Sequence, residues 1–329
     1  MTELEAPETT FRAISSQSGL SGIVDDRLIE RLTGLSHIAI SDQHTFVSAL
    51  RSGNQKTSLY YFPFLHSFAR APRQPLLWEK VGDSVCVFML ANMHKSPSLR
   101  LYLPPFPFSA KALKWAEQRQ QTFNGTNTCA IVWVDQPAGA ELMEQGYRLD
   151  YRESEYIYGG DLVRAANGSK FSRLRRNLSR VRNLEHILIR EYEARDQGAC
   201  LELLSRWRQR RDDQGLKTEG YGYTRRIVEH ASEFTDGLLR GEVVFVGERL
   251  VGFSFGGRLT SSMECIFIAV SDHDFSSLGY MLRHNFIANG PQDKLFNDGE
   301  DGGNVGIRDV KLAFRPVEMN HLYRAYVGE

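Results

Sequence analysis

The amino-acid sequence predicts an α/β (α+β) protein of two domains, each a mixed sheet flanked by helices. Three observations lead to this class. The chain has 329 residues, about twice the length of an ordinary domain of roughly 150 residues. Stretches with helical spacing of apolar residues alternate with short apolar runs typical of strands. The second half repeats this alternation, so the halves can be divergent copies of one α/β unit.

The domain limits follow from composition. Residues 1–22 are rich in Ser, Thr, Gly and Glu, which is typical of a loose tail. A first domain is expected over 23–160 and a second over 161–329, with the boundary at Gly159-Gly160.

The elements of the first domain begin with an amphipathic helix, "DRLIERLTGL", at Asp26. Two apolar runs around a Gly82-Asp83 turn predict a hairpin, and "LRLYL" predicts another strand. A helix then starts at a Ser109 cap, and "CAIVWV" reads as a buried strand. The stretch "AGAELMEQGYRLDYRESEYIY" predicts a helix, a stop at Gly146 and a strand.

The second domain shows the same style of pattern. Its expected elements are the basic helix at 170–182, the strand "ILIREY", the helix "QGACLELLSRWRQRR", the strand pair "EVVFVGERLVGFSFGG", the strand "SMECIFIAV", the helix "SLGYMLRHNFI", and strands near 294–297 and 310–318.

Composition excludes some classes of protein. The chain is 42% hydrophobic and 24% charged, as in folded soluble proteins. Its 40 basic and 40 acidic residues balance, so a polyanion would have to bind a local patch. The most apolar stretch, 85–93, is far shorter than the roughly 20 residues that span a bilayer, and the first 25 residues show no export signal. We expect a cytoplasmic protein without integral membrane contact.

Cysteines and histidines indicate neither a disulfide nor a metal. Four cysteines lie far apart without a CxxC pair and read as buried thiols in a reducing compartment. The nine histidines show no HExxH motif or paired ligand spacing. We expect no metal and no bound cofactor.

The helix "KFSRLRRNLSRVR" concentrates positive charge on one side. Its apolar residues recur at helical spacing, and the chain between Asp161 and Glu185 contains seven basic residues and no acid. An ordinary solvated helix mixes acids with bases, and arginine suits bidentate binding of phosphate. The candidate phosphate-binding residues are Lys170, Arg173, Arg175, Arg176, Arg180 and Arg182. Arginines at 206–211 on the following helix could extend this patch.

The stretch "NDGEDGGNVGIRDVKLAF" gathers Asp298, Glu300 and Asp301 in a glycine-rich loop before Lys311, which is expected on a strand. The spacing does not fit a calcium loop. One interpretation is a flexible acidic turn. In the other, the carboxylates hold an ammonium group or take its proton while Lys311 offsets negative charge. Tyr221 and nearby Tyr223 suggest a mobile loop that closes over a site, or a plain solvent loop.

Two blocks of sequence resemble a known family. "EYIYGGDL" leads into "GSKFSRLRRNLSRV", and "NDGEDGGNVGIRDVKLAFRPV" follows near the C-terminus. They are similar to the tyrosine-rich strand, basic helix and acidic ending of the C-terminal domain of lysylphosphatidylglycerol synthases and its soluble relatives. The first 150 residues agree in outline only. The tandem arginines and Leu174 shift the family's basic register by one residue, and the loop carries Asp where relatives often have Arg.

This resemblance implies two tandem acetyltransferase-like (GNAT-type) domains. It also implies transfer of an amino acid from a charged tRNA to an amine or hydroxyl of a small-molecule, peptide or lipid acceptor, with peripheral lipid contact left open. On this basis we hypothesise that Glu264 or Asp298 is the base and that Lys311 stabilises negative charge. The substrate-binding candidates are Asn297, Glu300, Asp301, Arg308 and Tyr221, with Glu300 or Asp301 recognising the aminoacyl ammonium.

Two other functions stay open at this point. The same type of domain can bind CoA at a helix N-terminus, which would give an acyl-CoA-dependent N-acyltransferase. The corresponding stretch, "VSDHDFSSLGYML", contains Asp272 and Asp274, and these carboxylates would repel a pyrophosphate. A non-enzymatic RNA-binding module would account for the basic helix but not for the acidic loop.

Overall fold

The computed structural model describes residues 26–51, 55–71, 74–93, 96–215, 218, 220–235 and 237–328, and the tail expected at 1–22 lies outside them. The chain forms two compact units. Unit 1 comprises Met1–Gln55, Leu65–Arg152 and Leu322–Glu329, and unit 2 comprises Lys56–Phe64 and Glu153–His321. We expected one division near Gly160. The units divide at Arg152 instead, and each takes in a short segment from the other half of the chain.

Unit 1 contains a mixed sheet in the order β1-β2-β3-β4-β5-β12. All of its described pairs are antiparallel except the parallel pair β4-β5. The predicted hairpin is present, with Gly82 at φ 63° in its turn. The strands are β1 (Ser36–His37), β2 (Leu76–Val81), β3 (Ser84–Ala91), β4 (Ser98–Leu101), β5 (Cys129–Asp135) and the final part of β12 (Glu318–Val327).

Helices α5 and α6 cover one side of the unit 1 sheet. Leu113 of α5 and Leu142 of α6 belong to the same buried cluster as Leu101 and Ile131 of the strands. Ser109 caps α5 as predicted, its hydroxyl accepting the Ala112 N–H. The described helices here are α2 (Asp26–Thr33), α3 (Gln43–Arg51), α5 (Ala110–Asn124) and α6 (Gln136–Glu144), with a short 3₁₀ turn at Ile40–Asp42. Helix α4 (Phe62–Phe68) begins in unit 2 and ends in unit 1, and the 3₁₀ turn at Ser58–Tyr60 belongs to unit 2.

Unit 2 repeats this topology. Its sheet runs β7-β8-β9-β10-β11-β6, and again only one described pair, β10-β11, is parallel. In both units a single helix, α5 or α11, connects the two parallel strands. The suggested internal duplication is therefore visible in the order and direction of the strands. They are the part of β6 (Arg148–Gly159) that follows residue 152, β7 (Ile187–Glu191), β8 (Arg240–Val246), β9 (Arg249–Arg258), β10 (Met263–Ser271) and β11 (Leu295–Asn297).

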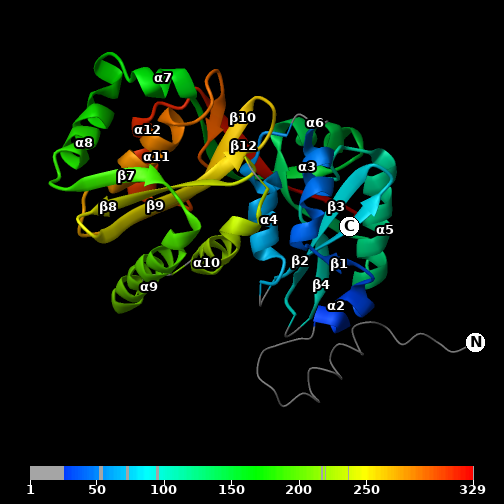
Figure 1. The fold of residues 1–329 in the computed structure, drawn as a ribbon. Coiled ribbons are helices and arrows are strands. Elements are labelled where there is room, and N and C mark those ends of the chain that lie inside the picture. Colours follow the sequence, from blue (N-terminus) through cyan, green and yellow to red (C-terminus); the bar gives the residue numbers. More distant parts are fainter. Residues whose placement is uncertain are drawn as a thin grey trace, which may run out of the picture. The chain divides into compact units, whose positions relative to one another are not determined.

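The helices of unit 2 lie on both sides of its strands. Figure 1 shows α7, α8, α11 and α12 on one side and α9 and α10 on the other. They are α7 (Gly160–Ala165), α8 (Ser172–Arg182), α9 (Gln197–Asp213), α10 (Tyr221–His230), α11 (Leu278–Ala288) and α12 (Val305–Ala313), with 3₁₀ turns at Ser169–Phe171, Ala194–Asp196 and Ala231–Glu233.

The apolar side of α8 packs as its spacing predicts. Leu174 and Leu178 are buried in the same cluster as Leu278, Met281 and Leu282 of α11. Burying each such side chain contributes roughly 1.5–3 kcal/mol. The apolar side is thereby held on α11, and the arginine side is left toward solvent.

Two local predictions were wrong. The strand expected at 310–318 is helix α12 up to Ala313, and β12 begins only at Glu318. Lys311 therefore lies on a helix, which starts where the Asn304 side chain accepts the Ile307 N–H at 3.1 Å. Tyr221 and Tyr223 lie in helix α10 instead of a mobile loop, because Thr224, Ile227 and Val228 form a buried helical face.

Candidate functional site

The connection after the fifth strand differs between the two units. In unit 1, Asp135 ends β5 and α6 starts at the next residue, with the Asp135 carboxylate accepting the Ala138 N–H. In unit 2 the seven residues 298–304 separate β11 from α12. We call residues 298–304 the acidic loop. Since the topology is otherwise repeated, this insertion makes unit 2 the candidate for function.

Lys311 of α12 holds the backbone of the acidic loop in place. Its side chain is buried, and Nζ donates to the carbonyl oxygens of Asp298 and Glu300, the latter at 2.6 Å. The ammonium also lies 5.6 Å from the centre of the Tyr156 ring. Burial lowers the pKa of Lys311. The lysine therefore fixes the backbone of the loop and places a cation under it.

Asp298 is held in a buried ion pair. Arg283 of α11 donates its Nε to Asp298 Oδ2 at 2.7 Å, and the Tyr158 hydroxyl donates to the same oxygen at 2.9 Å. Burial raises the pKa of Tyr158 well above its ordinary value, so the hydroxyl stays a donor. Both partners of such a pair are needed, because leaving one charge unpaired inside a protein costs about 3–5 kcal/mol.

The carboxylate of Asp301 is also held by hydrogen bonds, whereas that of Glu300 is open to solvent. Asp301 accepts the Tyr156 hydroxyl at 2.5 Å and the Arg308 Nε at 2.9 Å. Burial alone would raise the pKa of Asp301, but the hydrogen bonds from Arg308 and Tyr156 outweigh it and lower that pKa. Glu300 is exposed, and its carboxylate makes no hydrogen bond or ion pair with any residue that the structure describes. It is the carboxylate of this loop that a cationic ligand can reach.

Asn297 connects the acidic loop to the strand beneath it. Its Oδ1 accepts the Gly299 N–H at 2.7 Å, and its Nδ2 donates to Glu155 Oε2 at 2.9 Å and to the Lys56 carbonyl at 2.8 Å. The side chain is therefore fully used inside the protein. Asn297 shapes the loop, and its side chain is buried.

Glu155 gathers chain segments that are far apart in sequence. It is fully buried, which raises its pKa, and it accepts five hydrogen bonds of 2.6–3.0 Å. So many donors can hold a buried carboxylate in place. The donors are Thr57 Oγ1, Ser58 N, Ser58 Oγ, Asn297 Nδ2 and Asn320 Nδ2.

Two predicted site residues lie apart from this cluster. Glu264 is paired with Arg240 at 2.7 Å, and the Arg240 guanidinium also covers the ring of Phe286. Tyr221 contacts Arg208, whose guanidinium lies 4.7 Å from its ring centre. No described contact joins Glu264 or Tyr221 to the acidic loop. Burial and the negative charge of Glu300 together raise the pKa of Tyr223 to about 12.

The first part of the basic helix is tied to its surroundings. Arg173 forms an exposed ion pair with Asp309 of α12 at 3.0 Å. Arg175 donates to the carbonyl oxygens of Ala166 and Gly168. The Lys170 carbonyl accepts from Arg315, and its ammonium lies 5.6 Å from the Phe171 ring centre. The Arg173–Asp309 ion pair links α8 to α12. The arginines that follow Arg175 on α8 lack such contacts with described residues.

The later arginines of α8 are Arg176, Arg180 and Arg182. All three are exposed, and none makes a hydrogen bond or ion pair within the described part of the chain. Arg176 and Arg180 lie one turn apart on the same side of α8, about 6 Å along its axis at 1.5 Å per residue. We call these two residues the arginine stripe. Cations without partners on a solvated helix are free to bind phosphates.

The arginines of α9 do not extend the stripe. Arg206 pairs with Glu202 and Arg210 with Asp274, and α9 lies on the other side of the unit 2 strands (Figure 1). Their charges are offset locally, so the basic surface is confined to α8.

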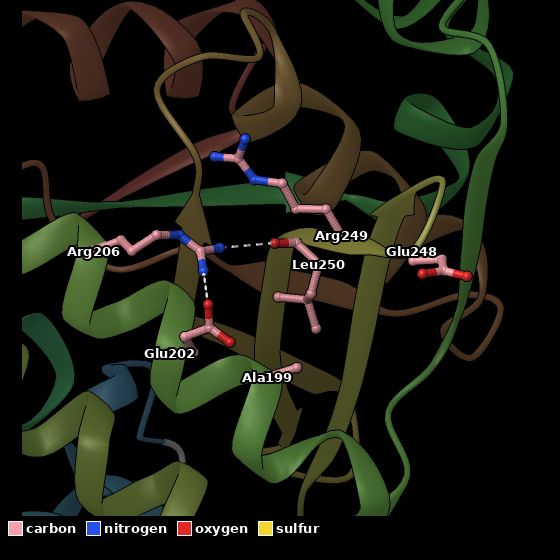
Figure 2. Close-up of a pocket in the computed structure, with 6 residues that line it drawn as sticks. All are labelled: Ala199, Glu202, Arg206, Glu248, Arg249 and Leu250. Atoms are coloured by element: carbon pink, nitrogen blue, oxygen red, sulfur yellow. Dashed lines mark hydrogen bonds and ion pairs between the residues drawn. The ribbon is translucent and has the colours of Figure 1, made fainter.

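A surface pocket beside α9 is lined by Ala199, Glu202, Arg206, Glu248, Arg249 and Leu250. Figure 2 shows Arg206 directed at Glu202 and the Leu250 carbonyl, whereas Arg249 and Glu248 point apart. The pocket therefore lacks polar groups that converge on a ligand, and no predicted site residue lines it. Within the described residues there is also no group of three or more His, Cys, Asp and Glu that could hold a metal, and no helix long and apolar enough to cross a membrane.

Sequence reasoning missed several residues of the cluster. Tyr156 and Tyr158 were part of the motif "EYIYGGDL" but received no role, although their alternation puts both on one side of β6. Arg283 interrupts the apolar helix α11, and an arginine in such a place is a signal for a buried ion pair. Thr57, Ser58 and Asn320 gave no such signal, since their role depends on Glu155.

No protein-family profile and no curated protein sequence matches the chain. Solved structures do match it. A conserved protein of unknown function from Bacteroides thetaiotaomicron has a TM-score of 0.77 at 19% identity, over 89% of this chain and 99% of that one. The lysylphosphatidylglycerol synthase structure from Bacillus licheniformis has a TM-score of 0.60 at 16% identity, over 87% and 91%. FemX has a TM-score of 0.62 at 9% identity, over 88% and 96%.

The C-terminal domain of a proposed lysylphosphatidylglycerol synthetase from Agrobacterium fabrum is similar as well, with a TM-score of 0.61 at 11% identity over 88% and 93%. At such low identities these likenesses concern the fold. They agree with the repeated strand order described above. The chain has a mixed α/β fold with flanking helices, like that of FemX and of the lysylphosphatidylglycerol synthase domains.

Proposed function

We propose that the protein transfers an aminoacyl group from a charged tRNA to an amine or hydroxyl acceptor, and that unit 2 carries the reaction. The observation that supports this most is the arginine stripe on α8, exposed and unpaired within the described residues. The Arg173–Asp309 ion pair joins that helix to α12, which directly follows the acidic loop. RNA phosphates bind such cations with release of counterions, whatever the base sequence.

Glu300 suits the donor end of such a substrate. An aminoacyl ester carries an ammonium group beside its reactive carbonyl, and an accessible carboxylate can hold that ammonium in a charge-assisted hydrogen bond. Lys311, buried under the loop, adds positive potential where the carbonyl oxygen would gain negative charge. The loop thus combines an anion for the ammonium with a cation for the oxyanion.

The proposed reaction is acyl transfer. The acceptor nitrogen or oxygen attacks the ester carbonyl carbon, the bond to the tRNA ribose oxygen breaks, and that oxygen gains the proton which the acceptor loses. Holding the two reactants together supplies much of the rate. We assign Asp298 to fixing the loop, because Arg283 and Tyr158 occupy its carboxylate. We leave Glu264 out of the mechanism, because Arg240 holds its carboxylate.

A transfer assay tests the proposal. A mixture of radiolabelled aminoacyl-tRNAs is incubated with the protein and with amines, peptides or phosphatidylglycerol vesicles, and labelled acetyl-CoA is assayed in parallel. We expect label transfer that ribonuclease abolishes. Transfer from acetyl-CoA alone would indicate an N-acyltransferase instead, and tRNA binding without any transfer would indicate an RNA-binding module.

A matched pair of variants locates the reaction. Glu300→Gln removes the accessible carboxylate and should lower kcat/KM by roughly 10- to 100-fold, as expected for losing a hydrogen bond to a charged group. Glu248→Gln makes the same change at the exposed β8-β9 turn and should leave kcat/KM unchanged. Equal activity of both variants would remove Glu300 from the site.

A further inference from the structure

The unit 1 sheet has two unlike sides at strands β4, β5 and β12. On the side that α5 and α6 cover, Leu101, Ile131 and Ala325 are each 0% exposed. On the opposite side the residues of the same strands, including Ala130 and Val132, are only partly buried. This second side is open to a ligand in a way that the core side is not.

Strand register places two arginines on that open side. Leu101 pairs with Ile131, and Ile131 pairs with Ala325, so these three residues share the core side. Successive side chains of a strand point to opposite sides of the sheet. Arg100 and Arg324, each next to one of these core residues, therefore share the open side. Tyr326 opposes Ala130 on the same side.

Neither arginine has a counterion among the described residues. Both side chains are partly buried, and neither makes a hydrogen bond or ion pair with any described residue. The strand register places both guanidinium groups on the same side of the sheet, and burial together with the positive charge of Arg324 lowers the pKa of Arg100. Two like charges, partly removed from water and without an anion, destabilise a fold.

We propose that Arg100, Arg324 and Tyr326 form a binding site for a phosphate-bearing anion. A phosphate would lie between the two guanidinium groups, each of which can donate two parallel hydrogen bonds to it. The Tyr326 hydroxyl, which has no hydrogen bond with a described residue, is a further donor, and the small Ala130 leaves room above the sheet. The residues of this site belong to unit 1, whereas the acidic loop and the arginine stripe belong to unit 2.

The phosphate can come from a free diphosphate group or from the backbone of an RNA. Two probes distinguish these sources: sodium pyrophosphate and an RNA stem-loop with a single-stranded 3′ end. Binding of each to the full-length protein is measured by equilibrium dialysis and by the shift in Tm. The variants are Arg100→Gln and Arg324→Gln. The control is Arg148→Gln, an exposed arginine of β6 in the same unit.

We expect the wild-type protein to bind at least one probe, and each site variant to bind it at least tenfold more weakly, while Arg148→Gln binds as wild type does. The decisive sign is the Tm without ligand. Removing either arginine relieves the repulsion, so the Tm of each site variant should rise by about 2 °C, whereas an arginine with a merely structural role would lower it when replaced.

The proposal is overturned if neither probe binds, or if the site variants bind as tightly as the control. A fall in the Tm of both site variants without ligand would equally overturn it. None of these measurements depends on aminoacyl transfer. They therefore test the phosphate site independently of the reaction proposed for unit 2.

Discussion

Lys311 and Arg283 are two cations inside unit 2, and they use their charge in different ways. The guanidinium of Arg283 forms an ion pair with the Asp298 carboxylate at 2.7 Å. Lys311 lies 3.9 Å from the Asp298 carboxylate but gives its hydrogen bonds to backbone carbonyls of the acidic loop. Of the two, Lys311 is the one whose positive charge is directed at the backbone of the acidic loop.

Replacing Lys311 by Met should destabilise unit 2 and lower transfer activity. The substitution keeps the length of the side chain but leaves the carbonyls of Asp298 and Glu300 without their donor, at a cost of about 1–3 kcal/mol for a buried group. Urea denaturation measures the loss. Lys294→Met is the control, since Lys294 also donates to a carbonyl, that of Ser261, but on the exposed surface; it should cost under about 1 kcal/mol.

The same variant carries a pH signature. Because burial lowers the pKa of Lys311 below its ordinary 10.5, the folded protein binds fewer protons than the unfolded chain at alkaline pH below that value. The free energy of unfolding of the wild type, relative to Lys311→Met, should therefore rise as the pH increases toward 10.5. A flat difference between the two proteins across this range would contradict a buried, titrating lysine.

At the scale of elements, the spacing of apolar residues predicted helix α8 correctly but did not predict helix α12. The spacing of Leu174, Leu178 and their neighbours predicted the helix and its packed side, and both are confirmed. Helix α12 was mistaken for a strand. Val310 and Phe314 lie four residues apart on its packed side, but Lys311 is buried beside them, and a buried lysine disguises the apolar side of a helix.

Removing charge from α8 should weaken RNA binding in a salt-dependent way. The double variant Arg176→Gln/Arg180→Gln should bind tRNA more weakly at all salt concentrations. The slope of log K against log salt should fall in magnitude by about 0.7–0.9 for each phosphate that the variant no longer neutralises. Filter binding over a salt series measures the slope. Arg206→Gln/Arg210→Gln on α9 is the control and should leave the slope unchanged, because these arginines are paired with Glu202 and Asp274.

For the whole molecule, the duplicated topology and its exchanged segments are the main finding. Each unit repeats the same succession of strand directions, yet residues 56–64 belong to unit 2 and residues 322–329 to unit 1. Glu155 is the residue that holds the first of these segments, through Thr57 and Ser58. The integrity of unit 2 therefore depends on a piece of chain nearly one hundred residues upstream.

Glu155→Gln should destabilise unit 2 strongly. An amide presents hydrogens where the five donors require acceptors, so at least one buried donor is left unsatisfied and the free energy of unfolding should fall by about 2–4 kcal/mol. Urea denaturation measures this cost, and hydrogen exchange should show loss of protection at Ser58, whose N–H binds Glu155. Asp150→Asn on the same strand is exposed and should change little. Unaltered exchange at Ser58 in Glu155→Gln would show that the segment is held by other contacts.

The sequence by itself determined the alternation of helices and strands, the two-sided basic helix and the cluster of carboxylates after residue 296. These depend on periodicity and composition, which act over a few neighbouring residues. Tertiary structure decided which charges remain available. Arg240 forms an ion pair with Glu264, 24 residues away in the sequence, and Arg283 forms one with Asp298, 15 residues away. The carboxylate of Glu300 stays exposed. Such pairing follows from which strand ends and helix sides the sheet brings together, and a linear pattern does not contain that information.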